Sequence, residues 1–347
     1  AGPVQSEFET PAEFEQQPRN AAAGAYCMGR GGIRCEAEFA QVTTDTETTA
    51  LPPHHRPAQC SIRFQEQQSV VQGIAHTGRV RVTHFGAVQG ERLSQIALDL
   101  AIPWNQSFEG KSVTVPEAGE LPVKELPGGL ELTLLTPGSS ELAELKVVWE
   151  AEVRDANLDP GFGMTPNDEE DEEDEPFAGE DPPDVEALAQ TDFDGDDSEA
   201  NGSSIAFLAE FEGKRVLMAA DAHAGDLVAA LDRVSPDERV SVDLFKVSHH
   251  GSKRTTSRAL VEKVDCSRYV FSTNGSIFKH PDHEAVARVI KFGGPNPELL
   301  FNYRNSRNEI WDLGVLKDAH GYTTRYPEIG ETGLTLSLIH ISEPTRL

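Results

Sequence analysis

Residues 240–252 read VSVDLFKVSHHGS, and this stretch shows most clearly how the chain folds. The apolar run over 240–247 is typical of a buried strand. It leads directly into Ser248, His249 and His250, and the following Gly251 allows the backbone to turn sharply. Polar side chains that follow a strand in this way usually lie at the edge of an open sheet, where such sheets place their sites.

The same pattern of a strand followed by polar residues occurs twice more between residues 203 and 335. Asp221 and His223 follow an apolar run, and His280 precedes a proline shortly after another one. Alternation of strands with helices predicts an α/β fold. Strands are expected at 204–211, 215–220, 268–272 and 299–302, and helices at 226–231, 257–264 and 283–290.

The stretch 85–165 has weaker but recognisable periodicity, whereas 1–84 has almost none. No period of 3.6 or 2 persists over 1–84, so we expect irregular structure there, apart from a strand near 80–82. Beyond it, the pattern predicts helices at 91–100 and 142–153 and strands at 113–115, 121–126 and 130–135.

The charge of the 347-residue chain is concentrated in one segment. The net charge is −28, and seventeen of the 58 acidic residues lie between Asp168 and Glu199, where there is no Lys or Arg. We therefore predict a disordered acidic linker over 166–202. A calcium loop starting at Asp192 would need Gly and Glu where Asp197 and Ser203 stand. The charge also excludes a generally basic nucleic-acid binder, so any such contact must be local.

The composition favours a cytoplasmic protein without membrane contact. No run of 18 apolar residues is present, and no charged-then-apolar leader follows the first residue. The four cysteines, Cys27, Cys35, Cys60 and Cys266, lack metal-like spacing and are expected to be reduced thiols without a shared role.

Asp221, His249, His250 and His280 are the candidate metal ligands. Carboxylate and imidazole groups suit zinc, manganese or iron, and a carboxylate that bridges two ions can hold a water that becomes a hydroxide nucleophile. Adjacent histidines on extended backbone point in different directions, so one of the pair is expected to bind metal directly. Asp221, His249 and His280 are the candidate catalytic residues.

Several of these motifs resemble the second half of a metallo-β-lactamase-fold hydrolase of the ComEC-like branch. They are NGSSI at 201–205, LMAAD at 217–221, KVSHHGS at 246–252, STNG at 272–275 and HP at 280–281. The stretch 85–165, with FGAVQGE at 85–91, resembles the middle of the same proteins.

The resemblance implies a four-layer αββα sandwich and a metal-dependent hydrolase, often of phosphodiesters, with two zinc or manganese ions in an intact homologue. Asp221 would be the bridging carboxylate, His249 or His250 a ligand, and His280 a ligand or a substrate contact. Apart from the resemblance, Lys253 and Arg254 directly follow the histidine turn and could meet a phosphate locally, or they could form a solvated helix start.

The chain departs from that family in its first half. The motif His-x-His-x-Asp-His is absent, and His54, His55, His76 and His84 do not reproduce it. We interpret 1–84 as a mistranslated segment or a divergent insert. Residues 336–347 resemble a translated sequencing-library adapter, and we expect them to lie outside the fold.

Three functions remain open. The first is a hydrolase, impaired in this chain, whose hydroxide attacks phosphorus or a carbonyl carbon of a small-molecule or phosphodiester substrate. The second is a non-catalytic scaffold or partner-binding relic of the same fold. The third is an acidic interaction protein that works through residues 166–202.

Overall fold

The computed structural model describes residues 105–126, 128–155, 182–275, 279–331 and 333–338. It also describes Ala87, Val88, Gly90, Glu91 and Ser94, and the backbone alone of 22–23, 38–44 and 60–66. Within this part of the chain, every helix is too short or too polar to cross a membrane.

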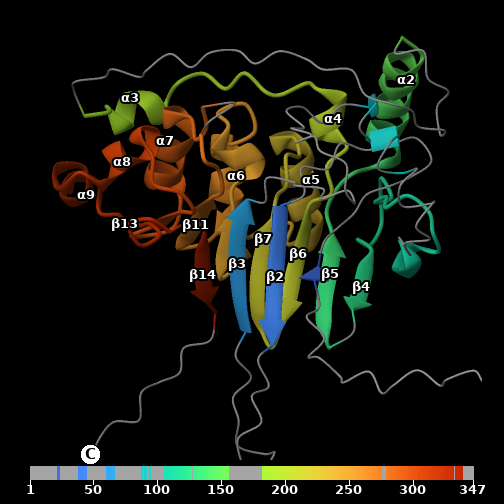
Figure 1. The fold of residues 1–347 in the computed structure, drawn as a ribbon, viewed down its shortest axis with the longest axis horizontal. Coiled ribbons are helices and arrows are strands. Elements are labelled where there is room, and N and C mark those ends of the chain that lie inside the picture. Colours follow the sequence, from blue (N-terminus) through green and yellow to red (C-terminus); the bar gives the residue numbers. More distant parts are fainter. Residues whose placement is uncertain are drawn as a thin grey trace, which may run out of the picture.

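An eight-stranded mixed sheet forms the centre of the fold (Figure 1). Its order is β13-β12-β11-β9-β7-β6-β5-β4; the strands from β13 to β7 are parallel, and those from β7 to β4 are antiparallel. The strands are β4 (Val123–Leu126), β5 (Leu130–Leu134), β6 (Phe207–Phe211), β7 (Lys214–Met218), β9 (Leu244–Lys246), β11 (Arg268–Phe271), β12 (Glu298–Phe301) and β13 (Thr323–Arg325).

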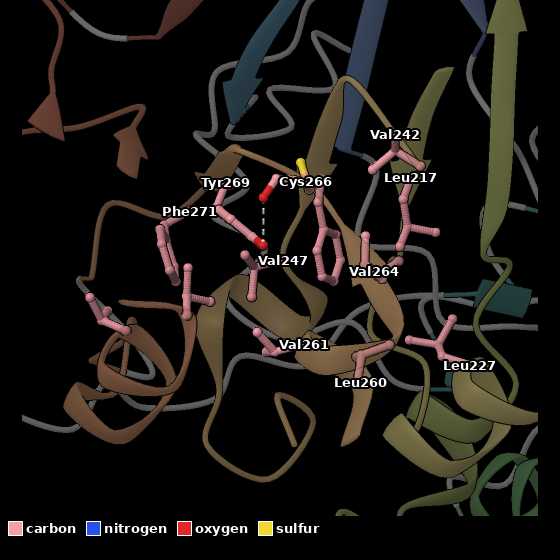
Figure 2. Packing of buried hydrophobic residues seen from close by; sticks show 14 of the residues in the cluster. Leu217, Leu227, Val242, Val247, Leu260, Val261, Val264, Cys266, Tyr269 and Phe271 are labelled. Carbon is pink, nitrogen blue, oxygen red and sulfur yellow. Dashed lines mark hydrogen bonds between the residues drawn. The ribbon is translucent and has the colours of Figure 1, made fainter. Parts of the chain in front are cut away.

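Helices cover one face of this sheet and bury the larger apolar core. They are α3 (Val185–Ala189), α5 (Ala224–Val234), α6 (Arg258–Lys263) and α7 (His283–Phe292). Leu217, Phe245 and Tyr269 project from successive strands into this core and are fully buried. Figure 2 shows Leu217 and Tyr269 in the same apolar cluster as Leu260 and Val261 of α6, with the Tyr269 hydroxyl donating to the Cys266 carbonyl at 3.0 Å. Burial of the phenol raises the pKa of Tyr269.

The opposite face of the sheet packs against a second, smaller sheet. Val216, Leu244 and Val270 alternate with the helix-facing residues and belong to the same buried cluster as Leu334 and Leu336 of β14 (Leu334–Ser337). The small sheet is antiparallel in the order β1 (Ala22–Ala23), β2 (Glu38–Thr44), β3 (Cys60–Glu66), β14. Figure 1 shows β2 and β3 in front of β6 and β7. A mixed α/β fold is confirmed; the four-layer αββα sandwich stays a prediction.

The remaining elements lie at the ends of the strands or beside the sheet. They are η1 (Gln106–Phe108), α2 (Ser139–Asp155), α4 (Glu199–Gly202), β8 (Val240–Ser241), η2 (Ser248–Gly251), β10 (Val264–Asp265), α8 (Ser306–Glu309), η3 (Ile310–Asp312) and α9 (Gly314–His320). β8 and β10 form a two-stranded parallel sheet of their own.

The β6–β7 hairpin, the helix expected at 142–153 and the strands at 121–126 and 130–135 are present, with shifted ends. At 113–115 the structure has only a single bridge, between Val115 and Gly138. The helix expected at 91–100 falls mostly outside the described residues, and the strand near 80–82 falls wholly outside them. The expectation of irregular structure across 1–84 is wrong at β2 and β3, which pair over seven residues.

Two segments that we set apart from the fold belong to it in part. Leu336 and Leu338, in the adapter-like tail, are buried, because β14 pairs with β3 and closes the inner face of the large sheet. Residues 182–202, in the predicted linker, contain α3 and α4, while 166–181 lie outside the described residues.

A buried arginine holds this acidic segment to the helices. Arg288 of α7 is 2 % exposed and donates hydrogen bonds to the carbonyls of Thr191 (3.1 Å), Lys253 (2.8 Å) and Thr256 (3.0 Å). Its guanidinium also lies 5.5 Å from the ring centroid of Phe193. The linker prediction failed here because charge density alone does not show that apolar residues such as Val185 are available for burial.

Candidate functional site

Two strand ends meet at the candidate site. After β7 the backbone turns at Ala220, whose φ is 47°, and reaches Asp221 before α5 begins. The His249 amide, just after β9, donates to the Ala220 carbonyl at 2.8 Å. Asp221 is half-buried, and its carboxylate makes no hydrogen bond or ion pair within the described part of the chain. The structure therefore places Asp221 next to the histidine turn but gives its carboxylate no direct partner there.

The histidine turn has an unusual backbone. His249, His250 and Gly251 have φ values of 44°, 56° and 86°, so three successive residues lie in the left-handed region. Residues other than glycine rarely adopt this region, and such strain persists where the surrounding structure imposes it. The expected extended backbone is therefore wrong at this turn. The two imidazoles nevertheless diverge, with ring centroids 6.0 Å apart and planes at 68°.

Contacts on both sides impose this conformation. The Ser248 hydroxyl donates to the Ala222 carbonyl at 3.0 Å, and the Asp282 amide donates to the Gly251 carbonyl at 2.9 Å. His250 is buried, and its Nδ1 lies 2.6 Å from the Ser272 carbonyl oxygen at the end of β11. The turn is thus tied to three neighbouring segments, which fixes where each imidazole lies.

His280 joins His249 at the site. Their ring centroids are 5.3 Å apart with planes at 73°, and the His280–Pro281 peptide bond is cis. The Nδ1 of His280 lies 3.6 Å from an oxygen of Asp282, which also accepts the Lys253 amide at 2.8 Å. Burial raises the pKa of Asp282, but the His280 imidazole and the Lys253 amide outweigh it, so the pKa lies below its usual range.

Asp196 and Asn201 also face His249, and the sequence analysis assigned neither to the site, although Asn201 begins the NGSSI motif. The Asn201 Nδ2 donates to Asp196 Oδ2 at 2.5 Å and lies 3.2 Å from His249 Nδ1, while Asp196 Oδ2 lies 3.6 Å from the same nitrogen. The Asp196 side chain is 8 % exposed. Burial raises its pKa, but the contacts with His249, Asn201 and the Ser198 amide lower it well below the usual range.

A local signal for Asp196 was present in the sequence. The Ser198 hydroxyl caps α4 by accepting a hydrogen bond from the backbone N–H of Asn201. The Asp196 carboxylate in turn accepts one from the backbone N–H of Ser198 at 3.0 Å. Serine is a preferred helix cap, and Asp196 two residues earlier is suited to a turn that precedes it. Reading this pattern as a helix start would have placed Asp196 and Asn201 in the folded domain.

Lys253 and Arg254, the two basic residues after the turn, already form ion pairs. The Lys253 Nζ lies 3.1 Å from Glu284, and Arg254 Nη2 lies 3.2 Å from Asp197 and donates to the Gly195 carbonyl at 2.9 Å. Their expected role as phosphate contacts would require these ion pairs to open. The carboxylates of Asp196 and Asp282 each lie 3.6 Å from the Nδ1 of His249 and of His280, respectively.

The described residues do not by themselves fit a metal centre. Among them, no three His, Cys, Asp or Glu side chains are placed to hold one ion. His249 and His280 come together, and Asp221 lies beside the turn, but these residues and His250 do not make such a group. The side chains of His54, His55, His76 and His84 lie outside the described residues.

The arrangement can bind a polar group and move a proton. An imidazole near a carboxylate is a common acid or base, and His249 and His280 each lie near one. Comparison of the chain with protein-family models, with curated proteins and with solved structures gives no match. A functional assignment therefore depends on this geometry and on the motifs that led to it.

Proposed function

We propose that this chain is a hydrolase of the metallo-β-lactamase type, with its reaction at the ends of β7, β9 and β11. One observation carries the proposal: the strained His249–Gly251 turn holds an imidazole 5.3 Å from that of His280 and is hydrogen-bonded to the residue before Asp221. Strained backbone of this kind clusters at functional sites. The motifs that resemble the family therefore converge in space, as a shared site requires.

Within this proposal, His249 and His280 transfer the proton and bind the substrate. A positioned imidazole accelerates proton transfer by about 10²–10⁴-fold, and Asp282 and Asp196 keep His280 and His249 in place. The substrate is a small molecule with a carboxylic ester or thioester bond, or a phosphodiester. Because Asp196 and Asp282 are ionised and Lys253 and Arg254 are paired, we expect a neutral ester to be cleaved faster than a phosphodiester.

The experiment measures hydrolysis of p-nitrophenyl acetate and of bis(p-nitrophenyl) phosphate by the purified full chain, without and with added zinc or manganese. We expect turnover that falls at least tenfold in His280→Gln and stays unchanged in His320→Gln, a matched change on α9 away from the site. Equal activity in wild type and His280→Gln would contradict the proposal.

A non-catalytic scaffold is the second candidate, and the lack of a three-ligand metal group among the described residues favours it. Metal analysis of the purified chain separates the two. About two equivalents of bound transition metal would support a metal-dependent hydrolase. A folded chain with neither metal nor turnover would support the scaffold.

A further inference from the structure

The orientation of the Asn201 side chain follows from its contact with Asp196. The amide nitrogen and oxygen of asparagine are told apart by their hydrogen-bond partners. An aspartate carboxylate at neutral pH can only accept hydrogen bonds, so an Asn201 amide oxygen 2.5 Å from Asp196 Oδ2 would be repelled. The group facing Asp196 is therefore the NH₂ of Asn201.

The same NH₂ faces His249. Its nitrogen lies 3.2 Å from His249 Nδ1 and carries a second hydrogen, which can be donated to that nitrogen. The Asp196 oxygen, at 3.6 Å, is beyond hydrogen-bond distance of the same Nδ1. In neutral His249 the Nδ1 therefore accepts, and the ring hydrogen must be on Nε2. In protonated His249 both nitrogens carry hydrogen, so Nε2 is a donor in either charge state.

His250 has the opposite arrangement. Its Nδ1 lies 2.6 Å from the carbonyl oxygen of Ser272, which only accepts, so Nδ1 carries the hydrogen. In neutral His250 the Nε2 then has the lone pair. The left-handed turn thus presents two adjacent imidazoles to different partners, and the partners give them opposite tautomers.

We infer that His249 acts as a hydrogen-bond donor to a substrate oxygen through Nε2–H and is not a metal ligand, with Asn201 as the residue that sets its tautomer. This inference deepens the proposed hydrolase and rests on it for the identity of the ligand, a carbonyl or phosphoryl oxygen. The His249 side chain is 17 % exposed, and its Nε2 has no hydrogen-bond partner among the described residues. A donor placed where negative charge develops on a substrate oxygen stabilises the transition state.

The test is the ¹⁵N spectrum of the imidazoles in the full chain at about pH 8, above the ordinary pKa of histidine of about 6.5. Comparison with His249→Gln assigns the signals of His249. We expect a pyrrole-type shift at Nε2 and a pyridine-type shift at Nδ1. The reverse pattern would overturn the inference. The measurement needs no turnover, so a chain that shows the expected tautomer but no hydrolysis would refute the proposed function alone.

Asn201→Leu tests the positioning role. Without the amide, Asp196 is the nearest polar partner of His249 Nδ1, and we expect the hydrogen to move to Nδ1. Ser203→Ala is the matched control, because it removes a hydrogen bond to Ala200 in the same short helix and does not touch His249. A folded Asn201→Leu variant that keeps the Nε2–H tautomer would refute the role of Asn201. If this variant does not fold, the wild-type spectrum still decides the tautomer.

Discussion

Asp221 and Asp196 are both aspartates near the histidine turn, but they differ in what surrounds them. Asp221 follows a buried strand and belongs to a motif, yet its carboxylate has no partner within the described residues. Asp196 comes from the most acidic stretch of the chain, yet it is almost fully buried and lies against Asn201 and His249. A strand end shows where a site lies, whereas the contacts around a side chain show which groups hold the histidines.

The largest effect in this comparison is expected from Arg288→Ala, which would free the segment that carries Asp196. Three carbonyl oxygens lose their buried donor, and unsatisfied buried groups are costly, so we expect a loss of about 4 kcal/mol in the free energy of unfolding. Urea denaturation measures it. Arg154→Ala, on the exposed end of α2, should cost about 0.3 kcal/mol. Equal losses in both variants would show that Asp196 does not depend on Arg288.

The next test concerns the turn that faces both aspartates. Gly251 has a φ of 86°, and a Cβ there would lie 2.7 Å from Phe271 Cδ1 and 2.8 Å from Pro281 Cβ. We expect Gly251→Ala to cost about 3 kcal/mol, from overpacking and the left-handed backbone together. Gly213→Ala is matched in φ, at 74°, but has no atom within 4 Å of the new Cβ, and should cost about 1 kcal/mol. Thermal unfolding measures both losses. The loss for Gly251→Ala minus the loss for Gly213→Ala is the cost of the contacts that the new Cβ makes with Phe271 and Pro281.

Asp196→Asn and Asp221→Asn compare the two aspartates directly. Because the folded-state pKa of Asp196 lies below its ordinary value, its ionised form stabilises the fold above a pH of about 3.9, and this contribution is lost as the pH falls. We expect Asp196→Asn to lose about 2 kcal/mol at pH 7, and the difference from wild type to shrink in acid. Asp221→Asn should change stability by less than about 0.5 kcal/mol at any pH. If Asp221→Asn lowered the free energy of unfolding as much as Asp196→Asn, the two aspartates would not differ in their contribution to stability.

The smallest effect is expected at Arg254, which forms an exposed ion pair beside the histidine turn. Arg254 is 44 % exposed, and Asp197 is 92 % exposed, so Arg254→Ala should cost about 0.5 kcal/mol in urea. If Arg254 is held by its contacts with Asp197 and Gly195, the variant should also leave cleavage of bis(p-nitrophenyl) phosphate unchanged. A large drop in that cleavage would mean that the ion pair opens to meet phosphate.

The strands and helices between 203 and 335 could be predicted from local patterns, because apolar runs such as 215–220 are bounded by turn residues. The approach of His249 to His280 followed from their positions at strand ends. Ser198 indicates locally where α4 begins, but the approach of Asn201 to His249 joins residues 48 positions apart and could not be predicted from local patterns. β2 was missed because its sequence, EFAQVTT, does not alternate clearly between apolar and polar residues. β3, CSIRFQE, does alternate, with Cys60, Ile62 and Phe64 apolar, and this strand signal was overlooked.

The pairing of β14 with β3 bears on the order in which the protein can assemble. Leu334 lies opposite Phe64 in that register, so a contact that covers the inner face of the large sheet joins two segments far apart in the sequence. A chain emerging from the ribosome cannot make this contact until β14 has been synthesised. Contacts of such long sequence separation form slowly, so the apolar face lined by Val216, Leu244 and Val270 would stay open to chaperones or to self-association for longer than the helix-covered face.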